Sequence, residues 1–442
     1  MTLPRRVLVL GFRRTGQAVA SALAARGVRV RVADTARDVG TLPAPRAEIE
    51  LRLGDDGPHL LADVDLVVPS PGVPREAPAL AAAVRRGIPV VSEIELAFRL
   101  LSCPVIAVTG TNGKSTVTSL IGLALEKSGR ATFTGGNLGT PLVTALERAP
   151  EIAVAEVSSF QLEWVEQFRP AIGCLLNVTP DHLDRHASFE EYRELKSRLF
   201  AAQENRDFAV VNRDDPEAWR TAAGLRARVV SFGSAPVACG AWAGEGFAAL
   251  RLPEADEERY PLGRTRLVGR HNLENILAAI TVSRLAGATP AAVQAAIDQL
   301  EPLPHRLALV RERGGVRWFD DSKATNVGAA ARSVDSFDGP VILLAGGIDK
   351  GGGYDGLVAS ARGKVKLALV FGAAADRIAT ALAGAEVSVE RVPTLEVAVS
   401  RAADAAAAKD TVLLAPACAS FDMFADYAAR GRAFRAAVEA LP

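Results

Sequence analysis

Residues 103–116, with the sequence CPVIAVTGTNGKST, decide the fold class of this chain. An apolar run at 105–108 leads into a turn with two glycines, and the helix-favouring segment 118–129, TSLIGLALEKSG, follows. A buried strand, a glycine-rich turn and a helix in this order are typical of a parallel α/β domain that binds phosphate at the turn. The segment therefore predicts an α/β protein with a P-loop-type nucleotide site.

The octet TGTNGKST at 109–116 supplies the groups that a nucleotide phosphate needs. Backbone N–H groups of the turn and the start of the helix cradle phosphate, while Lys114 reaches the terminal phosphates and Ser115 or Thr116 can bind Mg²⁺. Val108 stands where the common pattern GxxxxGK[ST] has its first glycine, so the match is incomplete. ATP is still the expected ligand, and the residues expected to contact it are Gly110, Thr111, Asn112, Gly113, Lys114, Ser115 and Thr116.

The order of strands and helices predicts three α/β domains. At roughly 150 residues per domain, the length of 442 residues corresponds to about three. The first hundred residues alternate apolar runs with amphipathic helices, which predicts a parallel sheet with helices on both faces. We expect a Rossmann-like domain at 1–98, a central ATP-binding domain at 99–302 and a Rossmann-like C-terminal domain at 303–442. The strands are expected near 6–12, 28–34, 63–72, 88–92, 105–108, 152–158, 171–178, 207–212, 340–347, 367–372 and 411–417.

Composition excludes several classes of partner. Lys plus Arg and Asp plus Glu are both 51, so no net field attracts nucleic acid or an anionic membrane. No stretch of the sequence approaches the roughly 20 apolar residues that span a bilayer. The four cysteines are far apart and form no CxxC pair, which argues against a zinc ribbon, a redox motif or a disulfide framework. We expect a cytoplasmic monomer whose partners are small molecules.

Lysine is scarce, so each lysine within a motif is informative. Only eight of the 51 basic residues are lysines. Where arginine is this strongly preferred, a lysine is expected for its compact ammonium or its nucleophilic amine, neither of which arginine supplies. Half of the lysines lie in motifs, at Lys114, Lys196, Lys323 and Lys350.

Two motifs that follow the octet offer metal ligands. In AEVSSFQ, 155–161, Glu156 ends a predicted strand, where a carboxylate faces the nucleotide crevice and can hold Mg²⁺, although a surface glutamate would look the same. In NVTPDHLDRH, 177–186, His182 and His186 are four apart and could share a helical face around zinc. No third soft ligand is near them in the sequence, and a pair of surface histidines is the alternative.

Two further motifs lie on predicted helices. Lys196, in YRELK at 192–196, reads on sequence alone as a solvated lysine on an amphipathic helix. In GRHNLEN, 269–275, Asn272 and Asn275 are three apart on one face. Their amides could pair with adenine through both donor and acceptor, or Asn272 could cap the helix.

The order of these motifs resembles that of the Mur ligase family over nearly the whole chain. The resemblance also rests on HR at 305–306, DDSKATN at 320–326, GGIDK at 346–350 and APACASFD at 415–422. It implies an ATP-dependent ligase that forms an amide bond through an acyl phosphate and uses two Mg²⁺ ions.

The same resemblance implies roles for particular residues. The residues that would bind Mg²⁺ are Ser115 or Thr116, Glu156, His182 and Lys196. Lys196 would do so as a carbamate, N6-carboxylysine, in which its amine has taken up CO₂. Lys114 and Lys323 would stabilise charge on the reacting groups. Further contacts to ATP are implied for Asn272, Asn275, Arg306 and Asp321.

DSKATN and PACASFD point, by the same resemblance, to the family member that adds D-glutamate to UDP-N-acetylmuramoyl-L-alanine in peptidoglycan precursor synthesis. The C-terminal domain would close on ATP and bind D-glutamate. Cations and hydroxyls suit the carboxylates of that amino acid. The implied pocket consists of Thr325, Lys350, Ser420, Phe421 and Tyr427.

The amino-terminal GFRRTG, 11–16, has the placement of a dinucleotide fingerprint, and Asp34 ends the second predicted strand. Arg13 replaces the central glycine, which disfavours NAD and a dehydrogenase, and it also departs from the glycine usual in Mur ligases. A turn with a purely structural role remains an alternative, and so does a nucleotide-binding switch without synthetic activity. The resemblance implies a UDP-sugar site that consists of Thr15, Asp34, Thr35, Arg37, Ser70, Gly72 and Asn137.

Overall fold

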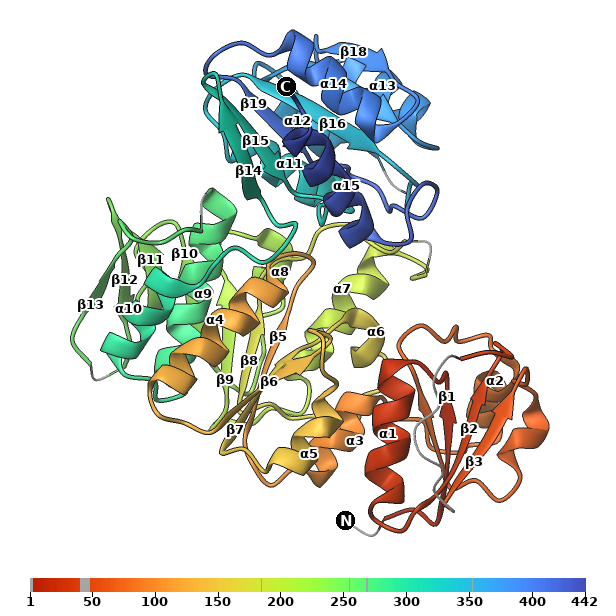
Figure 1. Ribbon diagram of the computed structural model, residues 1–442. Coiled ribbons are helices and arrows are strands. Elements are labelled where there is room, and N and C mark those ends of the chain that lie inside the picture. Colours follow the sequence, from red (N-terminus) through yellow and green to blue (C-terminus); the bar gives the residue numbers. More distant parts are fainter. Residues whose placement is uncertain (1–2, 40–47, 184, 254, 268, 352) are drawn as a thin grey trace. The chain divides into compact units, whose positions relative to one another are not determined.

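The computed structural model describes residues 3–39, 48–183, 185–253, 255–267, 269–351 and 353–442. Within these ranges the chain forms two compact units, and the first contains two of the three sheets (Figure 1). The first unit consists of Met1–Val178, Glu190–Pro261 and Ile276–Ala296, and the second of Thr179–Phe189, Leu262–Asn275 and Ile297–Pro442.

The first sheet is parallel, with the strand order β3-β2-β1-β4. Its strands are β1 (Arg6–Leu10), β2 (Arg29–Asp34), β3 (Ile49–Leu53) and β4 (Leu66–Pro69). The strand expected near 88–92 is wrong, because Val90 forms an isolated bridge to Val67 instead. β3 was not predicted.

Helices cover both faces of this sheet, as predicted (Figure 1). Leu8 and Leu10 pack with α2 (Pro78–Arg85) and the short helix η1 (Pro58–Leu61). Val9, which points to the other face, lies beside Gly16 of α1 (Arg14–Ala24). Because both faces are buried, β1 reads as a continuous apolar run.

The second sheet has the strand order β13-β12-β11-β10-β9-β8-β5-β7-β6. Strands from β6 through β11 in this order pair in parallel, and β12 and β13 add antiparallel at one edge. The strands are β5 (Val105–Thr109), β6 (Thr132–Gly136), β7 (Ile152–Glu156), β8 (Ile172–Leu175), β9 (Phe208–Asn212), β10 (Arg228–Gly233), β11 (Gly240–Ala243), β12 (Phe247–Arg251) and β13 (Glu258–Pro261). β5 lies between β7 and β8, so the carboxyl ends of these three strands meet at one edge.

The helix predicted after the octet is confirmed as α4 (Lys114–Lys127), which packs across β5, β7 and β6. The other helices between the first sheet and residue 300 include short single turns. They are α3 (Glu93–Leu100), η2 (Leu142–Thr144), α5 (Ala145–Arg148), α6 (Ser159–Leu162), α7 (Phe189–Ser197), η3 (Arg198–Phe200), α8 (Pro216–Arg220), α9 (Arg270–Leu285) and α10 (Pro290–Gln299).

The second unit contains the third sheet, with the order β14-β15-β19-β16-β17-β18. β14 is antiparallel to β15, and the other pairs are parallel. The strands are β14 (Ala308–Arg313), β15 (Val316–Asp320), β16 (Val341–Gly346), β17 (Val365–Phe371), β18 (Ser388–Arg391) and β19 (Thr411–Leu414). The helices are α11 (Val327–Asp335), α12 (Asp355–Ala361), α13 (Ala375–Ala383), α14 (Leu395–Ala405) and α15 (Tyr427–Glu439).

Alternate residues of β16 divide the core of the second unit into two layers. Val341, Leu343 and Ala345 pack with α11, α12 and α13, whereas Ile342 and Leu344 pack with α14 and α15. This period of two places helices on both faces of the sheet.

Helix α3 is anchored by a buried carboxylate. The domain boundary expected near 98 falls within this continuous helix. The Glu95 carboxylate is 0% exposed and accepts hydrogen bonds from the backbone N–H groups of residues 166–168. It also forms an ion pair with Arg99, with 2.5 Å between Nε and Oε1. The first two sheets are therefore joined by a fixed helix.

Glu93, on the same helix, leads to a prediction about stability. Its carboxylate accepts a hydrogen bond from Val143 N, and burial raises its pKa from 4.5 to about 7. Because the folded-state pKa is raised, the contribution of Glu93 to the free energy of unfolding is full below pH 4.5 and is lost as the pH rises through about 7. Glu93→Gln removes this dependence, so wild type is expected to lose about 3 kcal/mol relative to the variant over that window.

Hydrogen exchange of the amides in α3, compared between wild type and variants at each of several pH values, would measure this difference in free energy. Glu147→Gln, which changes an exposed glutamate in the same unit, is the matched control. A Glu93→Gln profile parallel to that of wild type would contradict the prediction.

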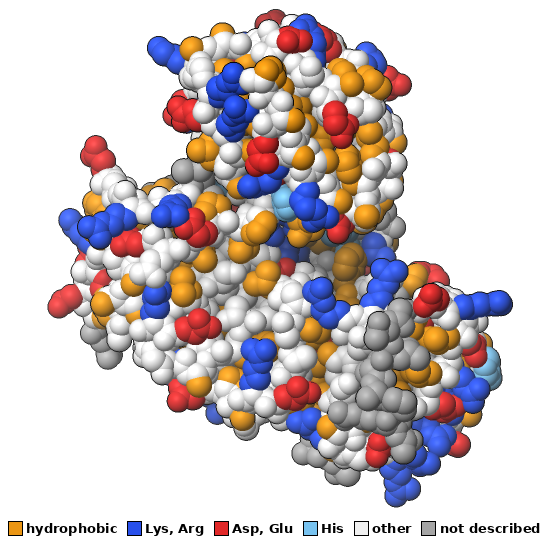
Figure 2. Space-filling view, viewed as in Figure 1, with side chains coloured by type: hydrophobic (Ala, Val, Ile, Leu, Met, Phe, Trp, Pro, Cys, Tyr) orange, Lys and Arg blue, Asp and Glu red, His pale blue; other side chains and the backbone are white. Residues whose placement is uncertain are grey.

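The surface mixes both signs of charge. On the visible face basic and acidic side chains are interspersed, which agrees with the equal totals of 51 (Figure 2). Among the residues described, no helix has the length and apolar character needed to cross a membrane.

Candidate active site

The octet forms a tight loop between β5 and α4. Gly110 has φ +155° and Gly113, the N-cap residue of α4, has φ +87°, conformations that side chains rarely adopt. Lys114 Nζ folds back over the loop and donates to the carbonyl oxygens of Gly110 and Thr111, at 2.8 and 2.9 Å. The start of α4 and its lysine are thus arranged as the sequence predicts for a phosphate site.

Asn177, which follows β8, holds this loop in place. Its Oδ1 accepts from Asn112 N at 2.8 Å, and its Nδ2 donates to Asn112 O at 3.1 Å. Its own carbonyl accepts from Thr111 N at 2.9 Å. Asn177 begins the motif NVTPDHLDRH, whose spacing indicates no role for it. Its place after the strand next to β5 was the available signal.

Glu156 ends β7, directly beside β5, and is 3% exposed. Its Oε2 accepts from Ser115 Oγ at 2.6 Å and its Oε1 from Asn137 Nδ2 at 2.7 Å. The alternative of a surface glutamate is therefore wrong. A hydroxyl and a carboxylate converge here beside the phosphate loop, and oxygen ligands of this kind suit Mg²⁺.

Lys196 lies near the end of α7 and is 1% exposed, so the alternative of a solvated lysine is wrong. Its Nζ donates to Gly110 O at 2.9 Å and lies 4.5 Å from the centre of the Tyr192 ring. The Tyr192 hydroxyl in turn lies 3.2 Å from Thr111 Oγ1. Tyr192, which sequence reasoning did not select, helps to seat Lys196 against the loop.

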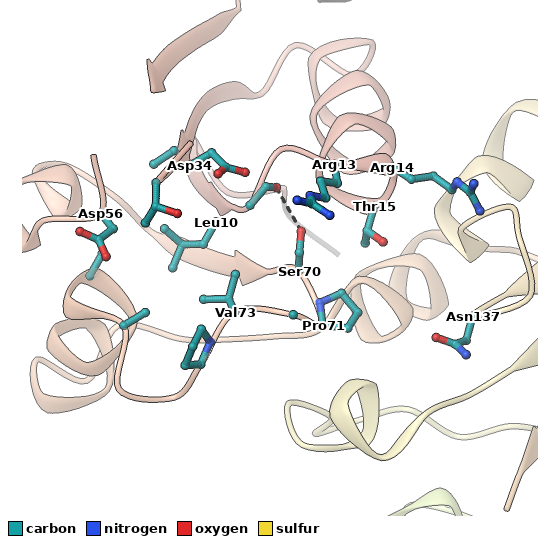
Figure 3. Close-up of a pocket in the computed structure, with 17 residues that line it drawn as sticks. Leu10, Arg13, Arg14, Thr15, Asp34, Asp56, Ser70, Pro71, Val73 and Asn137 are labelled. Atoms are coloured by element: carbon teal, nitrogen blue, oxygen red, sulfur yellow. Dashed lines mark hydrogen bonds between the residues drawn. The ribbon is translucent and has the colours of Figure 1, made fainter. Parts of the chain in front are cut away.

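A cavity of about 730 Å³ lies between the first sheet and the loop after β6 (Figure 3). Six of the seven residues expected to bind a UDP-sugar line it, namely Thr15, Asp34, Thr35, Ser70, Gly72 and Asn137. Arg37 is not among the lining residues and is exposed beside Gly54. Arg13 and Arg14 also line the cavity.

The turn at the head of this cavity depends on local geometry. Gly11 has φ +85°, and a Cβ on Gly16 would come within 1.9 Å of Gly11 O. Ser70 Oγ donates to the same carbonyl at 3.0 Å, while Asp34 Oδ2 accepts from Phe12 N at 2.7 Å. The two glycines of GFRRTG therefore permit the tight turn.

Candidate residues in the second unit include His182, Asn272 and Asn275. His182 lies in a loop with φ +56°, outside α7, so the idea of a helical face shared with His186 is wrong. Asn272 and Asn275 both lie inside α9, which begins at Arg270, and Asn275 Nδ2 donates to Asn272 Oδ1 at 3.2 Å. Asn272 is therefore not the N-cap of this helix.

Asp321 follows β15 and is buried. Burial raises the pKa of its carboxyl to about 6, although a hydrogen bond from Ser333 and the charge of Arg306 lower it. The Arg306 charge also helps burial to lower the pKa of His271 to about 4. Arg306 and Asp321, both expected to contact ATP, thus influence each other electrostatically.

This pKa predicts an acid limb in the dependence on ATP. Below pH 6 the Asp321 carboxyl is protonated and loses its charge, so kcat/KM for ATP is expected to fall about tenfold per pH unit. His271, with a pKa of about 4, stays neutral over that range. The effect of Asp321 on the free energy of unfolding has the opposite sign. Its stabilising contribution is full below pH 3.8 and is lost as the pH rises through about 6, because the folded-state pKa is raised.

The pH dependence of kcat/KM for ATP in wild type and Asp321→Asn would test this. The variant is expected to be slow and to lack the limb, whereas Asp338→Asn, at an exposed position of the same unit, should keep it. A limb that persists in Asp321→Asn would assign it to another group.

Of the five residues expected to bind D-glutamate, Thr325 and Lys350 contact each other, and Tyr427 contacts Lys323, the lysine expected at the reacting centre. Lys350 Nζ lies 3.3 Å from Thr325 Oγ1 and 3.5 Å from Asp181 Oδ1. Lys323 Nζ lies 4.1 Å from the centre of the Tyr427 ring. Ser420 is 2% exposed, whereas Phe421 is 71% exposed, so its ring is largely in solvent.

Arg430 of α15 ties the segments that carry these residues together. Although 0% exposed, its guanidinium donates to Ser322 Oγ and Ser322 O at 3.0 Å, to Gly346 O at 3.2 Å and to Cys418 O at 3.1 Å. Burial lowers its pKa to about 10, so it remains charged at neutral pH. These partners belong to DSKATN, GGIDK and PACASFD. Sequence reasoning missed Arg430.

Three family models match successive parts of the chain. Residues 5–92 match the "Mur ligase MurD-like, N-terminal domain", residues 108–283 the "Mur ligase middle domain", and residues 305–418 the "Mur ligase, glutamate ligase domain". The chain belongs to the Mur ligase family, as its phosphate loop and its three α/β sheets already indicate.

Similar relatives match almost end to end. A UDP-N-acetylmuramoylalanine–D-glutamate ligase of Syntrophus aciditrophicus is 46% identical, over 99% of this chain and 98% of the relative. Proteins of the same name from Pelobacter propionicus and Geobacter metallireducens are 45% and 44% identical, over 99% of this chain and 99% and 98% of theirs.

Solved structures support the fold. A pseudomurein peptide ligase type C from Methanothermus fervidus is similar with a TM-score of 0.65 and 18% identity, over 98% of this chain and 99% of that one. MurF ligase from Thermotoga maritima in complex with ADP is similar with a TM-score of 0.60 and 19% identity, over 98% of this chain and 95% of that one.

Proposed function

We propose that this chain is an ATP-dependent ligase that joins D-glutamate to UDP-N-acetylmuramoyl-L-alanine through an acyl phosphate. The observation that carries the proposal is the 42–46% identity, over nearly the full length, to relatives named for that reaction. The partly buried Lys114 and the buried Ser115, Glu156 and Lys196 gather at one loop, which supports it. The reaction serves peptidoglycan precursor synthesis.

The phosphate loop would bind the triphosphate of ATP. N–H groups at the start of α4 would donate to phosphate oxygens, and Lys114 would exchange its contacts with Gly110 O and Thr111 O for the terminal phosphates. The L-alanyl carboxylate attacks the γ-phosphorus and ADP leaves. The amine of D-glutamate then attacks the acyl carbon, loses a proton, and phosphate leaves.

Magnesium fits the oxygens gathered at the end of β7. Ser115 Oγ and the Glu156 carboxylate converge there in a buried position, and His182 is the candidate for a second ion. Bound Mg²⁺ would neutralise charge on the transferring phosphoryl group. Asn137, by donating to Glu156, holds that carboxylate in one orientation.

Lys196 suits conversion to N6-carboxylysine. Its amine is seated beside Gly110 O, and a carbamate nitrogen retains an N–H that can keep this hydrogen bond. The two carbamate oxygens would add an anionic ligand beside the phosphate loop. Lysine alone among basic side chains carries an amine suited to this addition.

The cavity beside GFRRTG would hold the UDP portion of the nucleotide substrate. Its backbone turn and polar lining suit a nucleotide, and Asn137 lines the cavity while it also contacts Glu156. One residue thus connects the nucleotide-sugar cavity with the metal ligands. This arrangement would place the L-alanyl end of the substrate toward the phosphate loop.

The second unit would supply further ATP contacts and the amino-acid pocket. We assign Asn272 and Asn275 to adenine, Arg306 and Asp321 to ATP, and Lys323 to charge at the reacting centre. The Lys350–Thr325 pair would hold a carboxylate of D-glutamate, with Ser420, Phe421 and Tyr427 as the other candidates.

We also propose three functional domains, a monomeric state and a cytoplasmic location. The UDP-sugar domain would end before α3, because that helix continues across the boundary expected near 98. The central domain would then begin with α3 and end at 302, and the third would span 303–442. The substrates are small molecules, which require no partner protein.

Phosphate release from ATP tests the function. Purified protein with Mg²⁺, bicarbonate and UDP-N-acetylmuramoyl-L-alanine would be given D-glutamate, L-glutamate, L-alanine or diaminopimelate. Release that needs both the nucleotide and D-glutamate is expected. Lys114→Met should abolish it, and Lys127→Met, at the exposed end of the same helix, should not.

Release with another amino acid would keep the family and overturn the proposed substrate. Release indifferent to any amino acid would favour a nucleotide switch.

A further inference from the structure

Arg13 places a guanidinium in the nucleotide-sugar cavity. It is the N-cap residue of α1, is exposed, and lines the cavity beside Ser70 (Figure 3). Within the described part of the chain its side chain makes no hydrogen bond or ion pair with protein groups. Its charge is therefore available to a ligand in the cavity.

Arg14, the next residue, is placed differently. It also lines the cavity, but its Nη1 donates to Gly139 O at 2.9 Å. In Figure 3 its side chain runs toward the loop that carries Asn137, whereas Arg13 stays over the turn. Two adjacent arginines thus have separate tasks, because one braces a loop and the other faces the cavity.

The charges that line the cavity make a cation necessary for an anionic ligand. Asp34 and Asp56 both line it. Asp34 accepts from Phe12 N at 2.7 Å and from Ala36 N at 2.9 Å, so its carboxylate shapes the turn and adds negative charge close to it. The chain has a formal net charge of zero, so only local groups can offset this repulsion.

We propose that Arg13 binds the diphosphate of the nucleotide substrate and sets the preference of the cavity for a nucleoside diphosphate over a nucleoside or monophosphate. A planar guanidinium can bind two phosphate oxygens at once. Because its side chain lies over the turn at Gly11, Arg13 would supply a side-chain contact to phosphate that a glycine at this position could not make. The inference rests on the proposed UDP-sugar site.

Calorimetric titration of the full chain with uridine, UMP and UDP tests this, in the presence of EDTA so that no metal bridges the phosphates. Wild type is expected to bind UDP more tightly than UMP, and UMP more tightly than uridine. Arg13→Gln should weaken UDP about tenfold, the loss typical of a hydrogen-bonded charge, and leave uridine unchanged. The affinity of Arg13→Lys for UDP should lie between those of wild type and Arg13→Gln, because lysine keeps the charge but lacks the planar guanidinium that binds two oxygens at once.

Arg26→Gln is the matched control, since it removes the same charge from an exposed arginine just beyond the other end of α1. It should bind UDP as wild type does. The difference between wild type and Arg13→Gln should shrink as salt is raised, whereas a difference caused by misfolding would extend to uridine.

Equal affinity of wild type and Arg13→Gln for UDP would overturn the inference, as would an equal loss for uridine and UDP. The proposed function is tested separately by phosphate release with UDP-N-acetylmuramoyl-L-alanine and D-glutamate. If wild type turns over this substrate but its affinity for UDP does not depend on Arg13, only the proposed role of Arg13 is wrong. If wild type neither binds UDP nor turns over the substrate, the proposed function and the role of Arg13 are both wrong.

Discussion

Lys196→Arg is expected to lower kcat for phosphate release about a hundredfold or more, with smaller changes in KM. Lys196 is buried with Nζ against Gly110 O, so it adjoins the reacting phosphates in the proposed mechanism. Arginine keeps a positive charge but has no amine that can take up CO₂. A lost anionic metal ligand removes transition-state stabilisation of about 3 kcal/mol, which corresponds to the stated loss.

Three measurements separate the carbamate from a simple packing effect. Wild type in CO₂-depleted buffer should lose activity and recover it with bicarbonate, whereas Lys196→Arg should respond to neither change. Labelled bicarbonate should give a carbamate carbon resonance in wild type that the variant lacks. Lys127→Arg, at an exposed position of α4, is the control and should behave as wild type.

Activity of Lys196→Arg within a few-fold of wild type would contradict the carbamate. Bicarbonate-dependent activity in that variant would also do so.

Several interior strands were predictable because they are buried on both faces. β5, β7, β8 and β16 each lie between two neighbours and read as unbroken apolar runs. Their order along the chain, with the glycine turn after β5, was sufficient to predict the α/β class and the position of the phosphate loop.

Three strands at sheet edges were missed for the opposite reason, whereas the apolar edge strand β4 was predicted. β3 reads IELRL, β13 reads ERYP and β18 reads SVER, and each lies at the edge of its sheet, where half-exposed polar residues are tolerated. Conversely, the apolar segment 88–92 looked like a strand, yet it only bridges at Val90. The start of this segment is only partly buried, Pro89 is exposed, and proline has no N–H to donate to a strand ladder.

Residues that act through distant contacts could not be selected from spacing. Asn177 bonds to a loop 65 residues earlier, and Arg430 bonds to Ser322 across 108 residues. Lys196 was read as solvated because α7, FEEYRELKS, is rich in charge. Its burial arises from packing against the phosphate loop, and that contact is set by the sheet order rather than by its own helix.

Arg430→Met is expected to destabilise the second unit by about 3–5 kcal/mol and to raise KM for D-glutamate more than that for the nucleotide substrate. Removal of the guanidinium leaves Ser322 O, Gly346 O and Cys418 O buried without these donors, and unmet acceptors of this kind are costly. The segments that contain Ser322, Gly346 and Cys418 would then lose their common hydrogen-bond donor. Lys350 and Ser420 lie a few residues after Gly346 and Cys418, so the amino-acid pocket would lose its fixed position. Hydrogen exchange in β16 and β19 would measure the loss within this unit, since unfolding of a chain with several domains need not be two-state.

Arg430→Lys separates the positional role from overall stability. Its ammonium keeps the charge and can bond to some of the carbonyls, so exchange in β16 should be partly restored while KM for D-glutamate stays raised, because a point donor cannot span all three segments. Arg432→Met, an exposed arginine two residues along the same helix, should leave both quantities unchanged. If Arg430→Lys and Arg430→Met raised KM for the nucleotide substrate and for D-glutamate equally, Arg430 would support the fold of the unit without positioning the amino-acid pocket.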